Sequence, residues 1–296
     1  MPLFFIISGY LYKSHKATKL LKAFFLPMLC YFILCFGYKY REFLFPFDYL
    51  ALIKELSGTA TSLIYNYKEQ YTEPMTGTWF LMTLVFLRLV AGDFSATENS
   101  FLWRNKISIS ILLVVLLSFI SMFWANTYAL VNAAPFVKAI TCCLPFFLLG
   151  KIIKEHENKL LNLSMSSTAL CLFIYVATAL INTFICRASN SFIDFNYSRI
   201  GNPYLFTYIA AAAAFLGFAN LFRHFKEKRL VTILSQGTLF ILGIHSMLLF
   251  FLNKFASHVG ISFGNFSALI VTITCTSVLV FLLFPVHKKL KFLLGK

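Results

Sequence analysis

Residues 202–229, NPYLFTYIAAAAAFLGFANLFRHFKEKR, decide the fold class of this chain. The run from Asn202 to Phe222 contains no charged residue, and four Lys or Arg residues follow within the next seven positions. About 20 apolar residues in a helix cross the ~30 Å hydrocarbon core of a bilayer, and basic residues concentrate at cytoplasmic helix ends. Ala210–Ala214 and Gly217 are small residues that let neighbouring helices pack closely. The stretch predicts a transmembrane helix that ends in the cytoplasm.

The composition of the whole chain agrees with this interpretation. The 296 residues are 59% hydrophobic and 12% charged, which leaves too little polar surface for a soluble protein of this size. The seven cysteines lie within or at the ends of apolar runs, without a CxxC pair or a clustering with histidine that would indicate a metal site. Soluble enzymes, nucleic-acid-binding proteins and disulfide-rich secreted domains are therefore excluded, and we expect no nucleic-acid partner and no metal.

The apolar runs predict an all-α, polytopic transmembrane helix bundle with eight full spans. The spans are expected at Leu20–Tyr38, Gly77–Gly92, Ile107–Ala125, Pro135–Gly150, Ser164–Cys186, Asn202–Phe222, Leu234–Leu252 and Phe266–Pro285. A ninth apolar run, Met1–Tyr12, is twelve residues long and would reach only about 18 Å as a helix. We interpret it as a partial span.

The positions of the basic residues predict the orientation. Eighteen Lys and Arg residues fall at alternate loops and adjoining span ends, and eight fall in the other set, although that set includes the longest loop. Because basic residues mark cytoplasmic loops, the C-terminus is expected in the cytoplasm. The same count places Met1 on the outer side within the membrane. We therefore expect a preceding helix, ten spans in total, and a single domain over residues 1–296 that is truncated at its N-terminus.

Few polar groups remain inside the predicted spans. All eleven Asp and Glu residues lie outside them, so the buried carboxylates that ion-coupled transporters use are absent from the spans. His245 lies near the middle of the span Leu234–Leu252. A buried titratable group is a candidate for function. The alternative is a neutral histidine that forms a hydrogen bond with a neighbouring helix.

Five segments resemble the acyltransferase-3 family of membrane-bound O-acyltransferases, and they occur in the family's order. The segment MPLFFIISGY resembles the family's P-L-F-F-x-I-S-G-Y/F run, and KLLKAFFLP resembles its basic loop before a proline-containing helix. GTWFL resembles its W-F-L motif, TLFILGIH its S-L-x-I-Y-L-L-H motif, and LPFFLLGK, more weakly, its F-F-L-L-G-K helix end. The segments span Met1–Tyr10, Lys19–Pro27, Gly77–Leu81, Thr238–His245 and Leu144–Lys151.

The resemblance is nearest to the short branch of sugar O-acetylases and intercellular-adhesin-like proteins. It implies a bacterial inner-membrane enzyme that moves an acetyl group from cytoplasmic acetyl-coenzyme A to a hydroxyl of a surface sugar or polysaccharide. Members carry an Arg and a His in their first helix, and this chain has neither. That absence agrees with the expected missing helix and predicts little or no activity for the 296-residue form.

The resemblance and the residue chemistry together give the candidate site residues. They are His245 as a catalytic residue, Ser8, Gly9, Lys19 and Lys22 for the acetyl-coenzyme A donor, and Trp79 and Tyr10 for the sugar acceptor. Each assignment has an alternative. Ser8 and Gly9 also suit tight helix packing, Trp79 also suits an anchor at the membrane interface, and the basic loops also suit contacts with anionic lipids.

Other functions remain as alternatives at this point. A transporter or flippase for a glycan or lipid-linked glycan would share the ten-span layout. A catalytically inactive family member that binds lipid or sugar would explain the lack of the first-helix Arg and His. Transfer of a labelled acetyl group into cell-surface glycan separates the enzyme from both.

Overall fold

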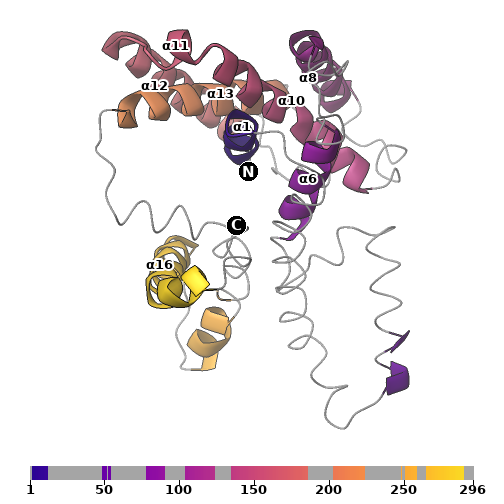
Figure 1. The fold of residues 1–296 in the computed structure, drawn as a ribbon, viewed down its shortest axis with the longest axis vertical. Coiled ribbons are helices and arrows are strands. Elements are labelled where there is room, and N and C mark those ends of the chain that lie inside the picture. Colours follow the sequence, from indigo (N-terminus) through magenta and orange to yellow (C-terminus); the bar gives the residue numbers. More distant parts are fainter. Residues whose placement is uncertain are drawn as a thin grey trace. The chain divides into compact units, whose positions relative to one another are not determined.

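A computed structural model describes residues 2–12, 49–51, 53–54, 78–90, 104–123, 135–185, 203–223, 248, 251–258 and 265–289 (Figure 1). Helices and turns account for the regular structure of these residues, and no strand occurs among them. The predicted all-α fold class is therefore confirmed over these ranges. The chain divides into two compact units. Unit 1 comprises Met1–Lys16 and Phe86–Lys226, and unit 2 comprises Ala17–Val85 and Glu227–Lys296.

The described helices of unit 1 follow from recognisable local signals. Pro135 and Pro203 are the first residues of their helices. A backbone N–H at this position has no acceptor within the helix, so proline, which lacks the N–H, loses no hydrogen bond there. The side chain of Ser164 accepts a hydrogen bond from the backbone N–H of Ser167 at 3.2 Å and so caps the helix that follows. The elements are α1 (Pro2–Tyr10), the end of α6 (Thr78–Arg88), α8 (Lys106–Phe123), α10 (Pro135–Glu155), α11 (Glu157–Leu160), α12 (Met165–Leu180), the π-helical turn η2 (Ile181–Ile185) and α13 (Pro203–Phe222).

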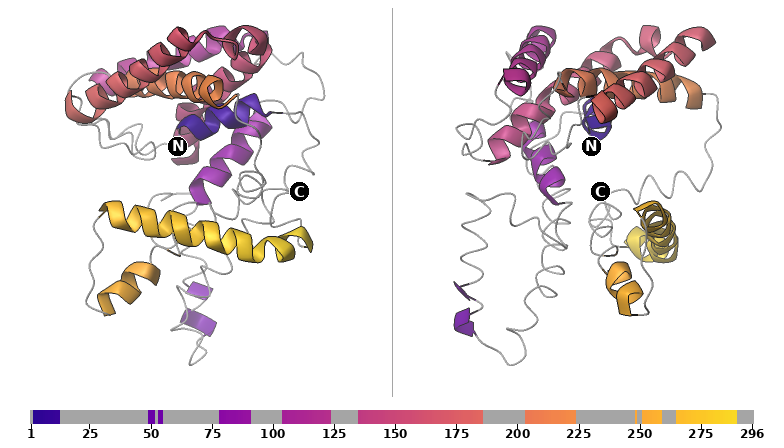
Figure 2. Two further views of the ribbon diagram at one scale, coloured as in Figure 1. Left: turned by 90° about the vertical axis from the view of Figure 1, so that its left-hand side faces the viewer. Right: turned by 180° about the vertical axis from the view of Figure 1, so that it is seen from behind.

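Helix α13 connects the packing of unit 1, because it contacts α1, α8 and α12 (Figure 2). Helix α10 contacts α1 and α8. Ala211, Ala213 and Ala214 of α13 are buried, as the small residues of this stretch predicted. The hydroxyl of Tyr204 donates a hydrogen bond of 2.8 Å to the backbone carbonyl of Cys142 on α10. This bond joins α13 to α10 within the apolar interior.

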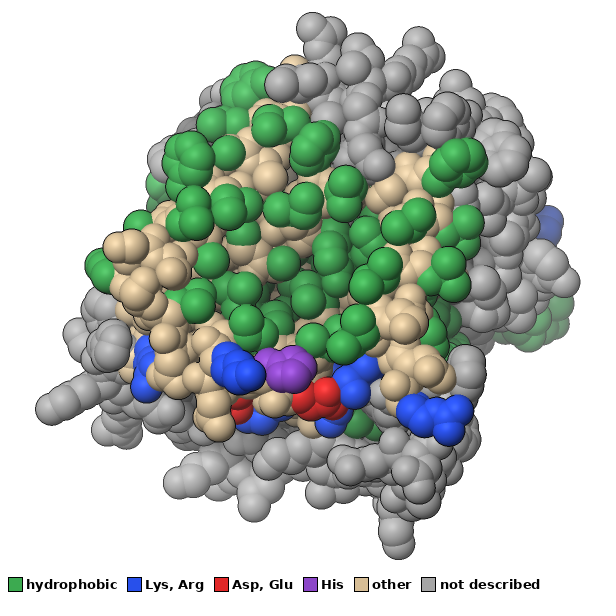
Figure 3. All heavy atoms as spheres, turned by 90° about the horizontal axis from the view of Figure 1, so that it is seen from above, with side chains coloured by type: hydrophobic (Ala, Val, Ile, Leu, Met, Phe, Trp, Pro, Cys, Tyr) green, Lys and Arg blue, Asp and Glu red, His purple; other side chains and the backbone are tan. Residues whose placement is uncertain are grey.

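The outer faces of α8 and α12 are apolar. Leu112 of α8 is 64% exposed and Phe173 of α12 is 69% exposed. Figure 3 shows one face of the molecule on which hydrophobic side chains gather, with Lys, Arg, acidic and His side chains along one edge. A soluble protein rarely exposes an apolar surface of this extent, and contact with lipid explains it.

The described part of unit 2 is smaller. It holds the first residues of α6, a helical segment at residues 251–258, and α16 (Asn265–Lys289). Thr83, Leu84 and Val85 of α6 are buried. Helix α16 covers the predicted span Phe266–Pro285 and extends it by about one turn at its C-terminal end.

The described helices fall on most of the predicted spans. Helices α6, α8, α10, α12 with η2, α13 and α16 coincide with predicted runs, whereas Leu20–Tyr38 and most of Leu234–Leu252 lie outside the described residues. Within the described residues, one helix is both long and apolar enough to cross a membrane, Tyr204–Phe222 with 19 residues. Shorter apolar helices occur at Lys106–Phe119, Met165–Leu180 and Ile270–Leu282.

Helix α10 differs from its prediction at the C-terminal end. The expected span stops at Gly150, and the helix continues to Glu155. The cations Lys151 and Lys154, which the sequence suggested as loop residues, therefore belong to its last turns. Positive charges are favoured there because the carbonyl end of a helix carries a partial negative charge. This extension gives the two lysines fixed positions beside α1.

Candidate functional site

The C-terminal end of α1 is held against α10 by direct backbone contact. A Cβ atom on Gly9 would collide with the backbone carbonyl oxygen of Phe147, and one on Gly150 would collide with that of Ile6. Only glycine permits this approach at both positions. Ser8, next to Gly9, is 5% exposed. The contact fixes the position of the next residue, Tyr10, relative to the end of α10.

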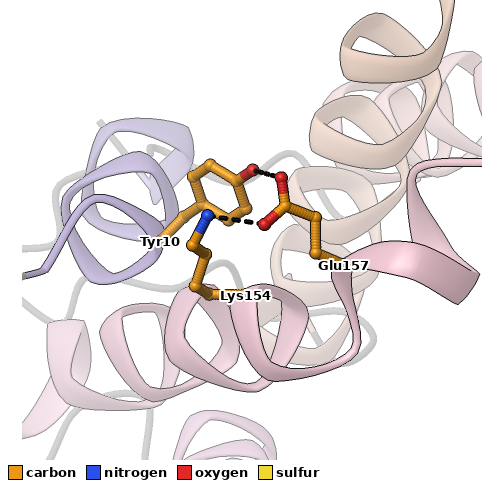
Figure 4. Close-up of polar contacts among 3 residues, drawn as sticks. All are labelled: Tyr10, Lys154 and Glu157. Carbon is orange, nitrogen blue, oxygen red and sulfur yellow. Dashed lines mark hydrogen bonds and ion pairs between the residues drawn. The ribbon is translucent and has the colours of Figure 1, made fainter.

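Tyr10 lies in a polar cluster with Lys154 and Glu157 (Figure 4). The Tyr10 hydroxyl donates a hydrogen bond of 2.6 Å to Oε1 of Glu157, and the Lys154 ammonium donates one of 2.5 Å to Oε2. The Lys154 Nζ also lies 4.8 Å from the centre of the Tyr10 ring, within cation–π range. The side chains of Lys154 and Glu157 are 48% and 40% exposed, so water reaches the cluster. We call Tyr10, Lys154 and Glu157 the Tyr10 cluster.

The hydrogen bonds of the Tyr10 cluster determine its charge state. The pKa of Glu157 is lowered, first by the hydrogen bond from Lys154 and second by that from Tyr10. The pKa of Lys154 is raised, chiefly by its hydrogen bond to Glu157. Both shifts favour the charged forms, so at neutral pH the cluster contains a carboxylate between an ammonium and a hydroxyl.

A second tyrosine extends the cationic surface along the same helix ends. The Tyr12 ring has the guanidinium carbon of Arg88 at 6.0 Å and the Nζ of Lys151 at 5.8 Å from its centre. Tyr12 is buried, and its ring meets that of Phe147 edge-on at 5.7 Å. Tyr12 thus joins the ends of α1, α6 and α10. Positive groups therefore lie beside both tyrosine rings at this end, with Tyr12 buried.

The α11 turn that carries Glu157 is held by α13. The side-chain amide of Asn220 donates to the carbonyl of Leu160 at 3.0 Å and accepts from the N–H of Leu163 at 3.0 Å. Arg223 donates to the carbonyl of Leu161 at 2.9 Å and contacts the side chain of Asn162. The turn between α11 and α12 is therefore attached to the C-terminal end of α13.

The same end of unit 1 contains a separate ion pair. Lys106 at the start of α8 lies 2.9 Å from a carboxylate oxygen of Glu155 at the end of α10. Like the Tyr10 cluster, this pair lies where α10 ends, so both ion pairs described in unit 1 are at the same end of that unit. It is the end that the distribution of basic residues assigns to the cytoplasm.

The structure describes some of the predicted site residues. Ser8, Gly9 and Tyr10 lie together on α1, and Gly9 is in the tight packing contact with α10. Trp79 belongs to α6, but its side chain is outside the described part of the chain, as are Lys19, Lys22 and His245. The roles assigned to these residues therefore stay predictions. Among the described residues, no group of three or more His, Cys, Asp or Glu is placed to hold a metal ion.

The comparison with known families settles the class of the protein. The sequence profile of the acyltransferase-3 family, described as an acyltransferase domain, matches residues 1–284. The chain belongs to the acyltransferase-3 family. The match runs through both units and includes all five segments of the resemblance, and it assigns the chain to the membrane acyltransferases. No curated protein and no solved structure matches the chain.

The sequence did not identify the Tyr10 cluster as a unit. Tyr10 was expected at the acceptor, and the acidic residues were considered only for their absence from the spans. One signal was present: the segment LPFFLLGK ends in Lys151, directly after a family-like helix end, and Lys154 follows three residues later. Recognising that α10 continues through Lys154 would have placed this lysine one turn from Gly150 and hence near α1.

Proposed function

We propose that this acyltransferase-3 protein is an integral membrane O-acetyltransferase. It moves an acetyl group from cytoplasmic acetyl-coenzyme A to a hydroxyl of a cell-surface sugar or polysaccharide. It lies in the bacterial inner membrane, with the polytopic helix bundle predicted from the sequence and the C-terminus in the cytoplasm. Family membership supports the acyl transfer, and the described end of unit 1 supports the location of the donor.

The observation that carries the proposal is the cationic and aromatic surface at the predicted cytoplasmic end. Lys154 lies over the ring of Tyr10, and Arg88 and Lys151 flank the ring of Tyr12. Coenzyme A brings phosphates and an adenine ring, which require positive charge and flat apolar faces. Tyr10 and Lys154 provide an aromatic face with a charge beside it, and Lys151 and Arg88 add positive charge, at the end of unit 1 predicted to face the cytoplasm.

The reaction itself needs a base and donors to the developing oxyanion. The acceptor hydroxyl oxygen attacks the thioester carbonyl, the carbon–sulfur bond breaks, and the hydroxyl proton is finally carried by the coenzyme A thiol. The sequence predicted His245 as a catalytic residue, and we propose that it serves as this base in place of the first-helix His that other members carry. A general base contributes about 10²–10⁴ in rate, so its loss would reduce turnover without a comparable effect on donor binding. Tyr10 then lies at the donor end, whereas Trp79 keeps its predicted place at the acceptor.

The test is an acetylation assay with membranes from the bacterium that carries the gene. Membranes from cells with and without the gene receive acetyl-coenzyme A labelled in the acetyl group, and the label in surface glycan is measured. We expect label only when the gene is present. Unchanged glycan labelling after deletion contradicts the proposal, and a loss of surface glycan with no change in its acetyl content indicates a glycan transporter instead.

Variants of the same gene test the location of the donor. Lys151→Gln should raise the KM for acetyl-coenzyme A by about 3–10-fold with little change in kcat, because it removes one charge that contacts the donor. Lys159→Gln, which changes an exposed lysine of α11, is the matched control and should leave KM unchanged. His245→Ala should show the opposite pattern: kcat falls and the KM for acetyl-coenzyme A is unchanged.

A further inference from the structure

The three groups of the Tyr10 cluster are arranged around a negative charge. The hydroxyl hydrogen of Tyr10 and the ammonium of Lys154 both point to the Glu157 carboxylate (Figure 4). The donors come from the nine-residue α1 and the 21-residue α10, and the acceptor comes from the four-residue α11. Two donors that converge on a carboxylate are also the contacts that bind a phosphate oxygen.

The donors and the carboxylate differ in how firmly they are held. Tyr10 follows the glycine contact between α1 and α10, and its ring packs on Phe215 of α13 with centroids 5.4 Å apart. Glu157 is the first residue of α11, and the α13 contacts hold the far end of that turn through Leu160 and Leu161. Rotation of the Glu157 side chain alone would remove the carboxylate from Tyr10 and Lys154 without moving the backbone.

The contacts are also open to solvent and modest in strength. Lys154 and Glu157 are close to half exposed, and an exposed ion pair contributes little to stability because water screens it and both side chains lose freedom. An incoming phosphate group carries more negative charge than a carboxylate and offers more acceptor oxygens. It can therefore displace Glu157 and keep both donors satisfied.

We propose that Tyr10 and Lys154 form a phosphate-binding site and that Glu157 is an internal competitor occupying it in the absence of ligand. The inference rests on the proposed function and adds to it that competition by Glu157 limits donor binding. The ligand is a phosphate group on the cytoplasmic side, carried either by the adenosine end of coenzyme A or by an anionic lipid headgroup. On binding, the Glu157 carboxylate turns to solvent and the phosphate takes its two hydrogen bonds.

The test measures binding of adenosine 3′,5′-bisphosphate to the purified full chain in nanodiscs of neutral lipid, so that no acetyl transfer is needed. Glu157→Gln should bind it about two- to fivefold more tightly, the range that follows from the strength of an exposed ion pair. Lys154→Gln should bind it at least about fivefold more weakly, and Tyr10→Phe about twofold or more. Glu155→Gln is the matched control, because it removes the neighbouring carboxylate that pairs with Lys106, and it should change nothing.

A second arm distinguishes the source of the phosphate. The same variants are placed in nanodiscs containing phosphatidylglycerol, and lipid binding is followed by competition with the soluble bisphosphate. Tighter binding of Glu157→Gln to the bisphosphate alone identifies the coenzyme, and tighter binding to the lipid alone identifies the headgroup. Both results support the phosphate site.

Other results overturn the inference. Weaker or unchanged binding of both ligands to Glu157→Gln shows that Glu157 is a structural link and not a competitor. Equal effects of Glu157→Gln and Glu155→Gln show a general charge effect. If the binding results are as expected and acetyl transfer is absent in the cell, the phosphate site stands and the proposed function fails.

Discussion

Replacement of Gly9 or Gly150 by alanine tests the contact that positions Tyr10. At each position the new methyl group meets a backbone carbonyl of the facing helix, with Tyr10 N also 2.6 Å from the Cβ position on Gly150. Ordinary van der Waals contact begins at 3.4 Å, and a backbone oxygen cannot rotate away. Helices α1 and α10 must therefore separate by more than about 1 Å, which forfeits about half or more of the dispersion energy of each facing atom pair.

We expect each substitution to lower the free energy of unfolding by about 3 kcal/mol, at the upper end of the range for overpacked interiors. Gly217→Ala is the control. Its methyl group would meet the Cδ2 of Leu172 at 2.7 Å, a side-chain end that can move aside, and the Leu172 backbone N at 3.3 Å, only just inside ordinary contact. The loss should therefore stay below about 1 kcal/mol. All three changes replace glycine by alanine within a helix, so the gain in helix propensity is shared and cancels in the comparison.

The measurement is unfolding of the purified protein in detergent by increasing denaturant, followed by helix content. The double variant Gly9→Ala with Gly150→Ala should lose about as much as the worse single variant, because one substitution already separates the helices. Losses for Gly9→Ala and Gly150→Ala no larger than that for Gly217→Ala would refute the close approach of α1 and α10.

Three further outcomes are expected. Because the folded-state pKa of Glu157 is lowered from 4.5, its stabilising contribution is present above that value and is lost as the pH falls through the lowered pKa. Glu157→Gln should therefore show a flatter dependence of unfolding midpoint on pH below about 4.5. Tyr204→Phe removes the hydroxyl that donates to the backbone carbonyl of Cys142, and it should lower the free energy of unfolding by about 0.5–1.5 kcal/mol. Because the acceptor is a backbone atom, the same loss is expected when Tyr204→Phe is made in a Cys142→Ala variant. Asn220→Ala removes both hydrogen bonds to the α11–α12 turn and should speed amide hydrogen exchange there while leaving exchange in the interior of α10 unchanged.

The helical fold was largely predictable because long apolar runs have few alternatives in a membrane. The backbone must satisfy its hydrogen bonds internally, so a run such as Pro203–Phe222 forms a helix. The start of α13 at Pro203 and the cap of α12 at Ser164 follow local rules that a sequence displays. The prediction that small residues of α13 pack closely was also confirmed.

The Tyr10 cluster was not predictable by the same means. Tyr10 and Glu157 are 147 positions apart, and their meeting depends on how α1 crosses α10. The crossing point is set by Gly9 and Gly150, and each glycine alone suits many close contacts. Sequence also placed Lys154 in a loop, because the apolar run ends at Gly150 and hydropathy does not show where a helix ends among polar residues.

Helix α13 supports both sides of the Tyr10–Glu157 hydrogen bond. The ring of Phe215 packs against that of Tyr10, and the Asn220 side chain forms hydrogen bonds with the turn that follows Glu157. A tilt of α13 in a bilayer of different thickness should therefore carry donor and acceptor together and leave their separation unchanged. Membrane thickness should then have little influence on this bond, whereas a substitution that loosens either Phe215 or Asn220 would make it sensitive to the surrounding lipid.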